Sequence, residues 1–199
     1  MDTRTEGDIW TDFAAGSQEA FRELYDTYTD ILYAFGLRYT ADQELIKDCI
    51  HDLFIDLHTY RAGLAASPDS VKFYLLKSFR RKLNLALRKS SLFQLNGWLD
   101  RDHALPFPPF SFSIEHKIMA EEKERETLEA LAYEINQLPD RQREILYLKF
   151  KHDLSYEEIA ALMQVSVPTC RTLVYRGVKQ LRQQLNGLPL ASMLLLLLD

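Results

Sequence analysis

The stretch from Ser155 to Leu185 constrains the fold of this chain more than any other. It opens with a capping box, because Glu158 follows Ser155 by three residues and each side chain can bond the other residue's backbone amide. Apolar residues then recur at helical spacing. After a break at residues 164–166, a second amphipathic segment begins, with Pro168 in its first turn, where a missing amide proton costs little. The stretch therefore predicts two helices joined by a tight turn.

The second of these helices has two contrasting faces. Its polar face carries basic residues and, from Val167 to Leu185, no acidic one. Such a face suits the major groove of DNA, where arginine can bond guanine through two hydrogen bonds and lysine neutralises phosphate. The pattern also fits an ordinary helical hairpin with a solvated basic face, so the rest of the chain has to distinguish the two. The predicted inward stripe consists of Cys170, Leu173, Val174, Val178, Leu181 and Leu185.

The net charge of −5 conceals an uneven distribution of charge along the chain. Residues 72–89 hold seven basic and no acidic side chains, whereas residues 1–71 hold five basic and fourteen acidic ones. Residues 141–199 hold eight basic and five acidic side chains. Two basic regions on amphipathic helices, in an otherwise acidic chain, predict two separate contacts with nucleic acid and acidic surfaces for protein partners.

The composition favours an all-α fold, because glycine and proline are few and alternating β-branched runs are scarce. We expect two small helical domains joined by a linker that is rich in proline and aromatic residues. Residues 1–16 are expected to be a polar lead-in, with a helix after Ser17. The apolar run at residues 188–198 is too short to span a bilayer, which needs about 20 residues.

Two further amphipathic helices are predicted in the N-terminal half. The first begins near Thr40 or Ala41, and its outer side is expected to carry Asp48, Asp52, Phe54 and Ile55 among others. Exposed apolar residues beside these carboxylates predict a protein-docking surface. The second helix begins at Val71, and its basic residues alternate with aromatic ones, a pattern that suits single-stranded nucleic acid.

Several classes of protein are disfavoured by what the sequence lacks. Cys49 and Cys170 are too few for a disulfide framework and fit a reducing compartment, and no signal peptide opens the chain, so a cytoplasmic location is expected. No metal is expected, because the Cys, His and Asp residues at positions 49–58 do not share one helical face. Without a nucleophile–base pair or a glycine-rich phosphate loop, neither an enzyme nor a cofactor or small-molecule substrate is predicted.

With both halves read, the chain resembles a sigma factor of the extracytoplasmic-function (ECF) group within the sigma-70 family. The C-terminal half carries LPDRQREILYLKFKHDLSYEEIAALMQVS followed by a basic helix, a pattern shared with other helix-turn-helix proteins. The N-terminal half is more specific: IKDCIHDLFIDLHTYR resembles the family's core-polymerase-binding helix, and FYLLKSFRRKLNLALRK its promoter-melting helix.

The resemblance implies four segments in order along the chain. Residues 1–91 would form a region 2-like domain, which binds polymerase and recognises and melts the minus-10 element, and residues 92–117 would form a linker. Residues 118–187 would form a region 4-like helix-turn-helix domain, and residues 188–199 would form an apolar tail. The resemblance also implies a subunit that binds core RNA polymerase and directs initiation at promoters. The implied partners are core RNA polymerase, promoter DNA and an anti-sigma factor; the aromatic linker and apolar tail are similar to members held by membrane-bound anti-sigma factors.

The resemblance further implies a base-capture loop and three sets of site residues. The loop Arg61–Ser70 lies where family members capture a flipped base. Core polymerase would be bound by Asp48, His51, Asp52, Leu53, Phe54 and Leu57. The minus-10 element would be recognised and melted by Tyr74, Lys77, Arg80, Arg81, Asn84 and Arg88. The minus-35 element would be read by Pro168, Thr169, Arg171, Thr172, Tyr175, Arg176 and Lys179.

Three positions depart from the family pattern. His51 stands where glutamine is common, Gln164 where a turn often has glycine, and Leu173 where a polar or basic residue is frequent. The alternative function is a stand-alone helix-turn-helix transcriptional regulator that acts as a dimer on paired half-sites. That alternative would leave the basic helix at residues 72–89 unexplained.

Overall fold

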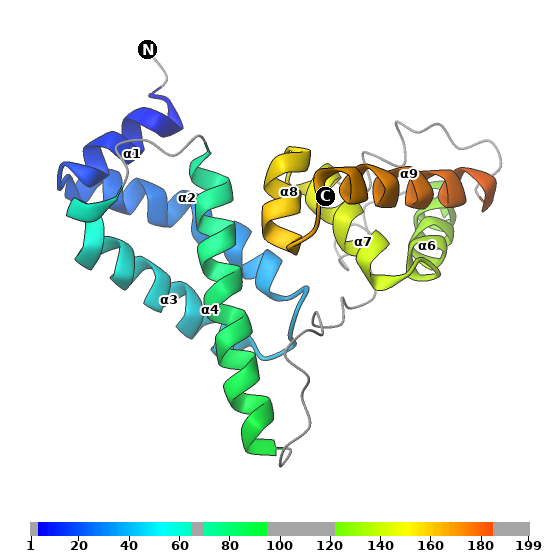
Figure 1. Ribbon diagram of the computed structural model, residues 1–199, viewed down its shortest axis with the longest axis horizontal. Coiled ribbons are helices and arrows are strands. Elements are labelled where there is room, and N and C mark those ends of the chain that lie inside the picture. The colour runs from blue at the N-terminus through cyan, green and yellow to red at the C-terminus, as the bar shows by residue number, and fades with distance from the viewer. Residues whose placement is uncertain (1–3, 65–69, 95–121, 185–199) are drawn as a thin grey trace. The chain divides into compact units, whose positions relative to one another are not determined.

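The computed structural model describes residues 4–64, 70–94 and 122–184 of the 199-residue chain (Figure 1). These residues form helices and connecting turns with no strand among them, which confirms the predicted all-α class. The chain divides into two compact units, Met1–Leu105 and Pro106–Asp199. Each unit is described by itself below.

The first unit is a bundle in which a long helix packs on two others. Its helices are α1 (Glu6–Ala14), α2 (Gln18–Gly36), α3 (Gln43–Tyr60) and α4 (Val71–Gln94), with a 3₁₀ turn η1 (Arg61–Gly63) after α3. Helix α4 contacts both α2 and α3. The core between these helices consists of large apolar side chains with almost no exposure, among them Leu32, Phe35, Ile46, Leu75, Phe79 and Leu83.

Helix α1 corrects the prediction that residues 1–16 form only a polar lead-in. A capping box of Thr5 and Asp8 starts this helix, and Trp10 and Phe13 are each only 1% exposed. A helix of nine residues is marginal in water, so burial of its two aromatic rings decides that it forms. Two aromatic residues are too short a pattern to show helical periodicity, which is why the sequence alone did not indicate it.

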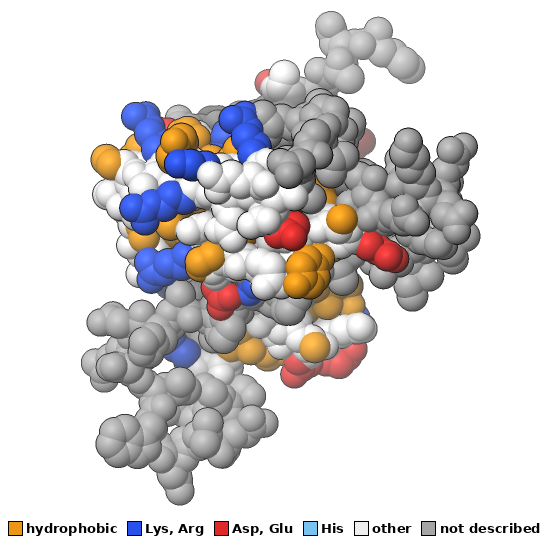
Figure 2. Space-filling model, turned by 90° about the vertical axis from the view of Figure 1, so that its right-hand side faces the viewer, with side chains coloured by type: hydrophobic (Ala, Val, Ile, Leu, Met, Phe, Trp, Pro, Cys, Tyr) orange, Lys and Arg blue, Asp and Glu red, His pale blue; other side chains and the backbone are white. Residues whose placement is uncertain are grey.

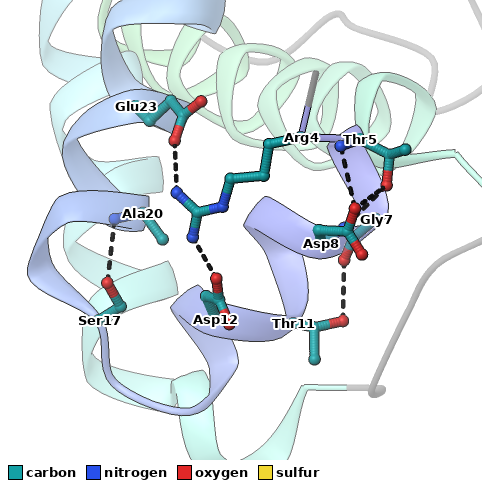
Figure 3. Close-up of polar contacts among 9 residues, drawn as sticks. All are labelled: Arg4, Thr5, Gly7, Asp8, Thr11, Asp12, Ser17, Ala20 and Glu23. Atoms are coloured by element: carbon teal, nitrogen blue, oxygen red, sulfur yellow. Dashed lines mark hydrogen bonds and ion pairs between the residues drawn. The ribbon is translucent and has the colours of Figure 1, made fainter. Parts of the chain in front are cut away.

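A cluster of polar contacts joins the N-terminal residues, α1 and the start of α2 (Figure 3). The guanidinium of Arg4 contacts Asp12 on α1 and donates to Glu23 on α2 over 3.0 Å. Ser17 caps α2 as predicted, since its hydroxyl accepts the amide proton of Ala20 at 3.2 Å. One arginine and one cap therefore fix the α1–α2 hairpin.

The start of α3 differs slightly from the prediction. The helix begins at Gln43, two to three residues later than expected, because Asp42 acts as its cap. The carboxylate of Asp42 accepts the amide proton of Leu45 at 3.0 Å. Asp is among the best capping residues, so it determines the boundary in preference to Thr40.

The second unit is built around the predicted pair of helices. Its elements are α6 (Glu122–Asn136), α7 (Asp140–Leu146), a π-helical turn η2 (Tyr147–Lys151), α8 (Tyr156–Met163) and α9 (Val167–Gln184). Helix α9 packs on α6, α7 and α8. The buried guanidinium of Arg143 donates to the carbonyl of Asn136 over 3.0 Å and so connects the end of α6 to α7.

Some predictions concern residues outside those described. They include residues 95–117 of the predicted linker, the apolar tail at 188–199 and the centre of the loop at 65–69. Within the described ranges, no helix is both long and apolar enough to cross a membrane.

Candidate nucleic-acid interface

Helices α8 and α9 form the helix-turn-helix at the C-terminal end of the described chain. The predicted capping box is confirmed: the amide of Ser155 donates to Glu158 over 2.7 Å, and the amide of Glu158 donates to the Ser155 hydroxyl over 3.1 Å. Gln164 has the left-handed φ of +56°, which costs a non-glycine residue about 1 kcal/mol. The turn is therefore strained, as the absence of glycine predicts. Ser166 caps α9 through the amide of Thr169 at 3.3 Å.

The two faces of α9 separate as the sequence predicted. Cys170, Val174 and Leu181 are buried, and Leu173 and Val178 are half-buried. All seven residues assigned to the minus-35 element are exposed: Pro168, Thr169, Arg171, Thr172, Tyr175, Arg176 and Lys179. On the face shown in Figure 2, Lys and Arg side chains gather along the left and upper edge, and Asp and Glu lie mostly elsewhere.

Glycine permits α9 to lie close to α7. A Cβ atom built on Gly177 would lie 3.1 Å from Cδ1 of Leu146, which is tighter than ordinary contact. The absence of a side chain at Gly177 therefore lets the buried face of α9 rest directly on α7, with the polar face directed outward.

A groove of about 510 Å³ runs beside α9 from Arg171 to Gln183. It is lined by Tyr156 from α8 and by Arg171, Val174, Tyr175, Val178, Lys179, Arg182 and Gln183 from α9. Sequence reasoning did not single out Tyr156. Its contact with Arg171 joins residues on different helices, so no pattern within one helix indicates it.

The basic residues of α4 are unequally accessible. Lys77, Arg81 and Arg88 are exposed, whereas Tyr74, Arg80 and Asn84 are half-buried. The guanidinium of Arg80 lies 5.3 Å from the ring centre of Tyr39, within range of a cation–π interaction. Tyr74 meets Trp10 edge to face at 5.2 Å. Of the six residues assigned to the minus-10 element, Tyr74 and Arg80 are thus partly engaged within the unit.

A second groove, of about 330 Å³, lies between the end of α3 and the outer face of α4. Asp56 from α3 and Lys82 from α4 form an ion pair in it with a distance of 2.5 Å. Tyr60, which is 66% exposed, and Tyr74 contribute aromatic rings to its wall. The remaining lining residues are Leu53, Leu57, Leu64, Ser78, Arg81 and Leu85.

The outer face of α3 requires one correction. Asp48, His51 and Asp52 are exposed, but Leu53, Phe54 and Leu57 are only 2%, 2% and 3% exposed. The predicted outward position of Phe54 is wrong, because its ring packs 4.8 Å from the ring of Tyr25 and 6.0 Å from that of Phe21, both on α2. Ile55, 48% exposed, is the apolar residue that lies on the outer face.

The cysteines and acidic residues suggest no further chemistry. Cys49 and Cys170 are buried free thiols, and burial raises the pKa of each above its usual value. Among the described residues, no group of three or more His, Cys, Asp or Glu side chains could hold a metal ion.

Comparison with known proteins agrees with this geometry. Residues 128–181 match the family model for region 4 of sigma-70 factors. The ECF RNA polymerase sigma factor SigW of Bacillus subtilis (strain 168) is 25% identical over 177 residues, covering 87% of this chain and 92% of SigW. The ECF RNA polymerase sigma factor SigX of the same organism is 28% identical over 178 residues, covering 85% of each chain.

Two solved structures share the fold. CnrH in complex with the cytosolic domain of CnrY matches with a TM-score of 0.56 and 16% identity, over 92% of this chain and 97% of that one. The sigma factor RpoE, in complex with the anti-sigma factor NepR from Bartonella quintana, matches with a TM-score of 0.53 and 18% identity, over 84% of this chain and 97% of that one.

The helix-turn-helix, its exposed basic helix and the region 4 match define a DNA-binding protein of the sigma-70 type. The whole-length relatives narrow this class further. Over most of its length the chain is similar to RNA polymerase sigma factors of the ECF group within the sigma-70 family, as the resemblance in the sequence implied. These relatives support a sigma factor role in transcription initiation.

Proposed function

We propose that this sigma factor binds core RNA polymerase through the outer face of α3, melts the minus-10 element with α4 and reads the minus-35 element with α9. The observation that carries the proposal is the division of α9: its basic residues are all exposed, while the described part of its apolar stripe is buried or half-buried against α7 and α8. The N-terminal half of the second helix is the part of a helix-turn-helix that contacts bases.

The chemistry of α9 supports minus-35 reading. Arg171 and Arg176 can each bond guanine through two hydrogen bonds, and Lys179 can neutralise phosphate. The Thr172 hydroxyl donates to the carbonyl of Pro168 over 2.9 Å, so this side chain is oriented by its own helix and presents its methyl group outward. A threonine methyl group suits contact with thymine.

The groove between α3 and α4 supports the minus-10 role. A displaced single strand needs cations along its backbone and flat rings on which bases can stack. Arg81 and Lys82 supply cations at the groove, and Tyr60 and Tyr74 supply rings. We propose that an unstacked base of the melted strand enters this groove beside the predicted capture loop at Arg61–Ser70.

The outer face of α3 supports docking on polymerase. Asp48, His51 and Asp52 form a polar surface with Ile55 as an exposed apolar residue next to them. Docking of this face on another protein would remove the exposed side chain of Ile55 from water. Leu53, Phe54 and Leu57 support this face from inside the unit.

An anti-sigma factor is the second protein partner that we propose. The support is that RpoE, a structural neighbour, is a sigma factor crystallised with the anti-sigma factor NepR. That such a partner is membrane-bound stays a prediction from the apolar tail.

Gel filtration with purified bacterial core RNA polymerase tests the docking face. The wild-type chain should co-elute with polymerase, and Asp52→Arg should abolish co-elution because it inverts a charge on that face. Glu129→Arg, the same charge change at an exposed position on α6, is the matched control and should co-elute. Failure of folded wild-type protein to co-elute, with footprints on two symmetric half-sites, would instead favour the stand-alone regulator.

Promoter binding by the assembled holoenzyme tests the role of α9. Arg171→Ala and Arg176→Ala should each reduce affinity for the promoter by about five-fold or more while leaving co-elution intact, since a bidentate arginine–guanine pair contributes roughly 1–3 kcal/mol. Arg22→Ala, at an exposed position on α2, is the control. Loss of co-elution in a folded Arg171→Ala variant would show that the assignment of α9 is wrong.

A further inference from the structure

Tyr156 makes contacts that connect the first helix of the helix-turn-helix to the second. The Arg171 guanidinium lies 5.6 Å from the centre of the Tyr156 ring, and the ammonium of Lys149 lies 5.5 Å from it. Both distances are within the range of about 6 Å for a cation–π interaction. The half-buried ring of Tyr156 therefore contacts the basic residue closest to the start of α9.

The ring itself is held firmly in place. Tyr156 is the first residue of α8, and the two bonds of the Ser155–Glu158 capping box fix its backbone. Lys149 donates to the carbonyl of Leu154 over 2.9 Å, so its ammonium near the ring is also anchored. A fixed ring can restrict a mobile arginine, whereas a mobile ring could not.

We propose that Tyr156 is a positioning residue for Arg171, which makes it a determinant of minus-35 specificity. The ring holds the guanidinium at the groove lined by Val174, Tyr175 and Lys179, in the conformation from which it reaches a base. This inference rests on the proposed minus-35 role of α9.

The physical basis is preorganisation. A free arginine side chain has many conformers, and bidentate bonding to guanine requires one of them. A side chain already restricted before binding loses less conformational freedom when it binds, and affinity rises accordingly. The tyrosine hydroxyl has no part in this effect, so only the ring should matter. A cation–π contact at a partly exposed site corresponds to about a two- to five-fold change in affinity.

Three variants at one position test the proposal. Tyr156→Phe keeps the ring, whereas Tyr156→Leu and Tyr156→Gln remove it, so that one truncation remains usable if the other fails to fold. Each variant is assembled with core polymerase, and its affinity for two duplexes is measured at the same salt concentration. One duplex carries the minus-35 sequence that the wild-type holoenzyme selects from a random library, and the other carries a scrambled sequence. The ratio of the two affinities is the preference. We expect Tyr156→Phe to keep the wild-type preference, and a truncation with wild-type melting temperature to lower it two- to five-fold.

A double-mutant cycle and an NMR measurement separate positioning from mere structural support. In the Arg171→Ala background, removing the ring should change the preference no further, because the two residues act as one unit. In the free protein, the Arg171 Hε resonance should lie upfield in wild type and Tyr156→Phe, and should move downfield on truncation. The resonance is assigned from its absence in Arg171→Lys.

The possible failures are distinguishable. If the wild-type holoenzyme selects no minus-35 sequence, or if Arg171→Ala retains its preference, the proposed role of α9 fails. If Arg171→Ala loses preference but ring removal leaves it unchanged, or adds its full effect to that of Arg171→Ala, the positioning role of Tyr156 is refuted. An Arg171 Hε resonance unaffected by ring removal would also refute it.

Discussion

Substitution of Gly36 by alanine tests how tightly the first unit is packed. Gly36 is the last residue of α2, and it is buried where α2 meets α3 and α4. A Cβ atom added there would lie 2.8 Å from Cγ2 and 3.0 Å from Cγ1 of Ile46, and 3.1 Å from Cζ of Phe79. Ile46 and Phe79 are themselves fully buried, so neither can move into solvent to make room.

The expected cost follows from two opposing terms. Inserting a methyl group into a well-packed core costs about 1–3 kcal/mol. Alanine gains up to about 1 kcal/mol over glycine inside a helix, but less at a final residue such as Gly36. We therefore expect Gly36→Ala to lower the free energy of unfolding of the first unit by about 1–2 kcal/mol.

The assay uses the single buried tryptophan of the described first unit. In a Trp98→Phe background, urea unfolding followed by fluorescence reports on Trp10, which is 1% exposed. With a slope of about 2 kcal/mol per molar urea, the midpoint should fall by roughly 0.5–1 M. The matched control is Gly177→Ala in the second unit, which meets only Leu146 and at 3.1 Å. It should leave the Trp10 transition in place. A Gly36→Ala midpoint equal to or above that of the parent would refute the packing argument.

Three further predictions concern polar contacts. Asp56→Asn should raise affinity for a single-stranded oligonucleotide, measured by fluorescence anisotropy, because it releases Lys82 from an ion pair. The free energy of unfolding should change by less than about 1 kcal/mol, since the pair is partly exposed. An unchanged affinity would contradict the proposed path of the strand. Ser155→Ala should lower the stability of the second unit by about 1 kcal/mol in thermal unfolding followed by circular dichroism, and a change near zero would mean that water replaces the cap. Asp8 accepts hydrogen bonds from Thr5, and these bonds lower the pKa of the Asp8 carboxyl below its usual value of 3.8. The cap therefore stabilises α1 above pH 3.8, and this stabilisation is lost as the pH falls through the lowered pKa. An NMR titration midpoint for Asp8 at or above 3.8 would contradict the predicted direction.

Much of the fold could be predicted because local signals and burial agreed. The caps at Ser17 and Ser155 lie where the sequence placed them, and the inward stripe of α9 is at least half-buried wherever it is described. The strained turn at Gln164 was also predictable, because a turn of this kind takes a left-handed residue whether or not glycine is available.

The predictions from the sequence were wrong where contacts between helices determine the structure. Helix α1 is too short to be recognised by periodicity and depends on burying Trp10 and Phe13. Phe54 lies next to Leu53 in an apolar arc wide enough to be covered by α2 as well as α4, and the sequence cannot show how many neighbours cover a helix. The contact of Tyr156 with Arg171 was beyond prediction for the same reason, since it joins residues on different helices.

The packing of α3 determines which substitutions can test the polymerase interface. Its outer face carries Asp52 and Ile55, while Leu53 and Leu57 on its inner side support the contact with α4. Removing either leucine would cost about 2–5 kcal/mol of stability and would displace the proposed DNA-contacting helix together with the docking helix. A loss of polymerase binding in such a variant therefore cannot show that the leucine contacts polymerase. Only substitutions on the outer face of α3, which leave the core intact, can separate polymerase binding from promoter opening. Ile55→Ser and Asp52→Arg are the two substitutions that meet this condition.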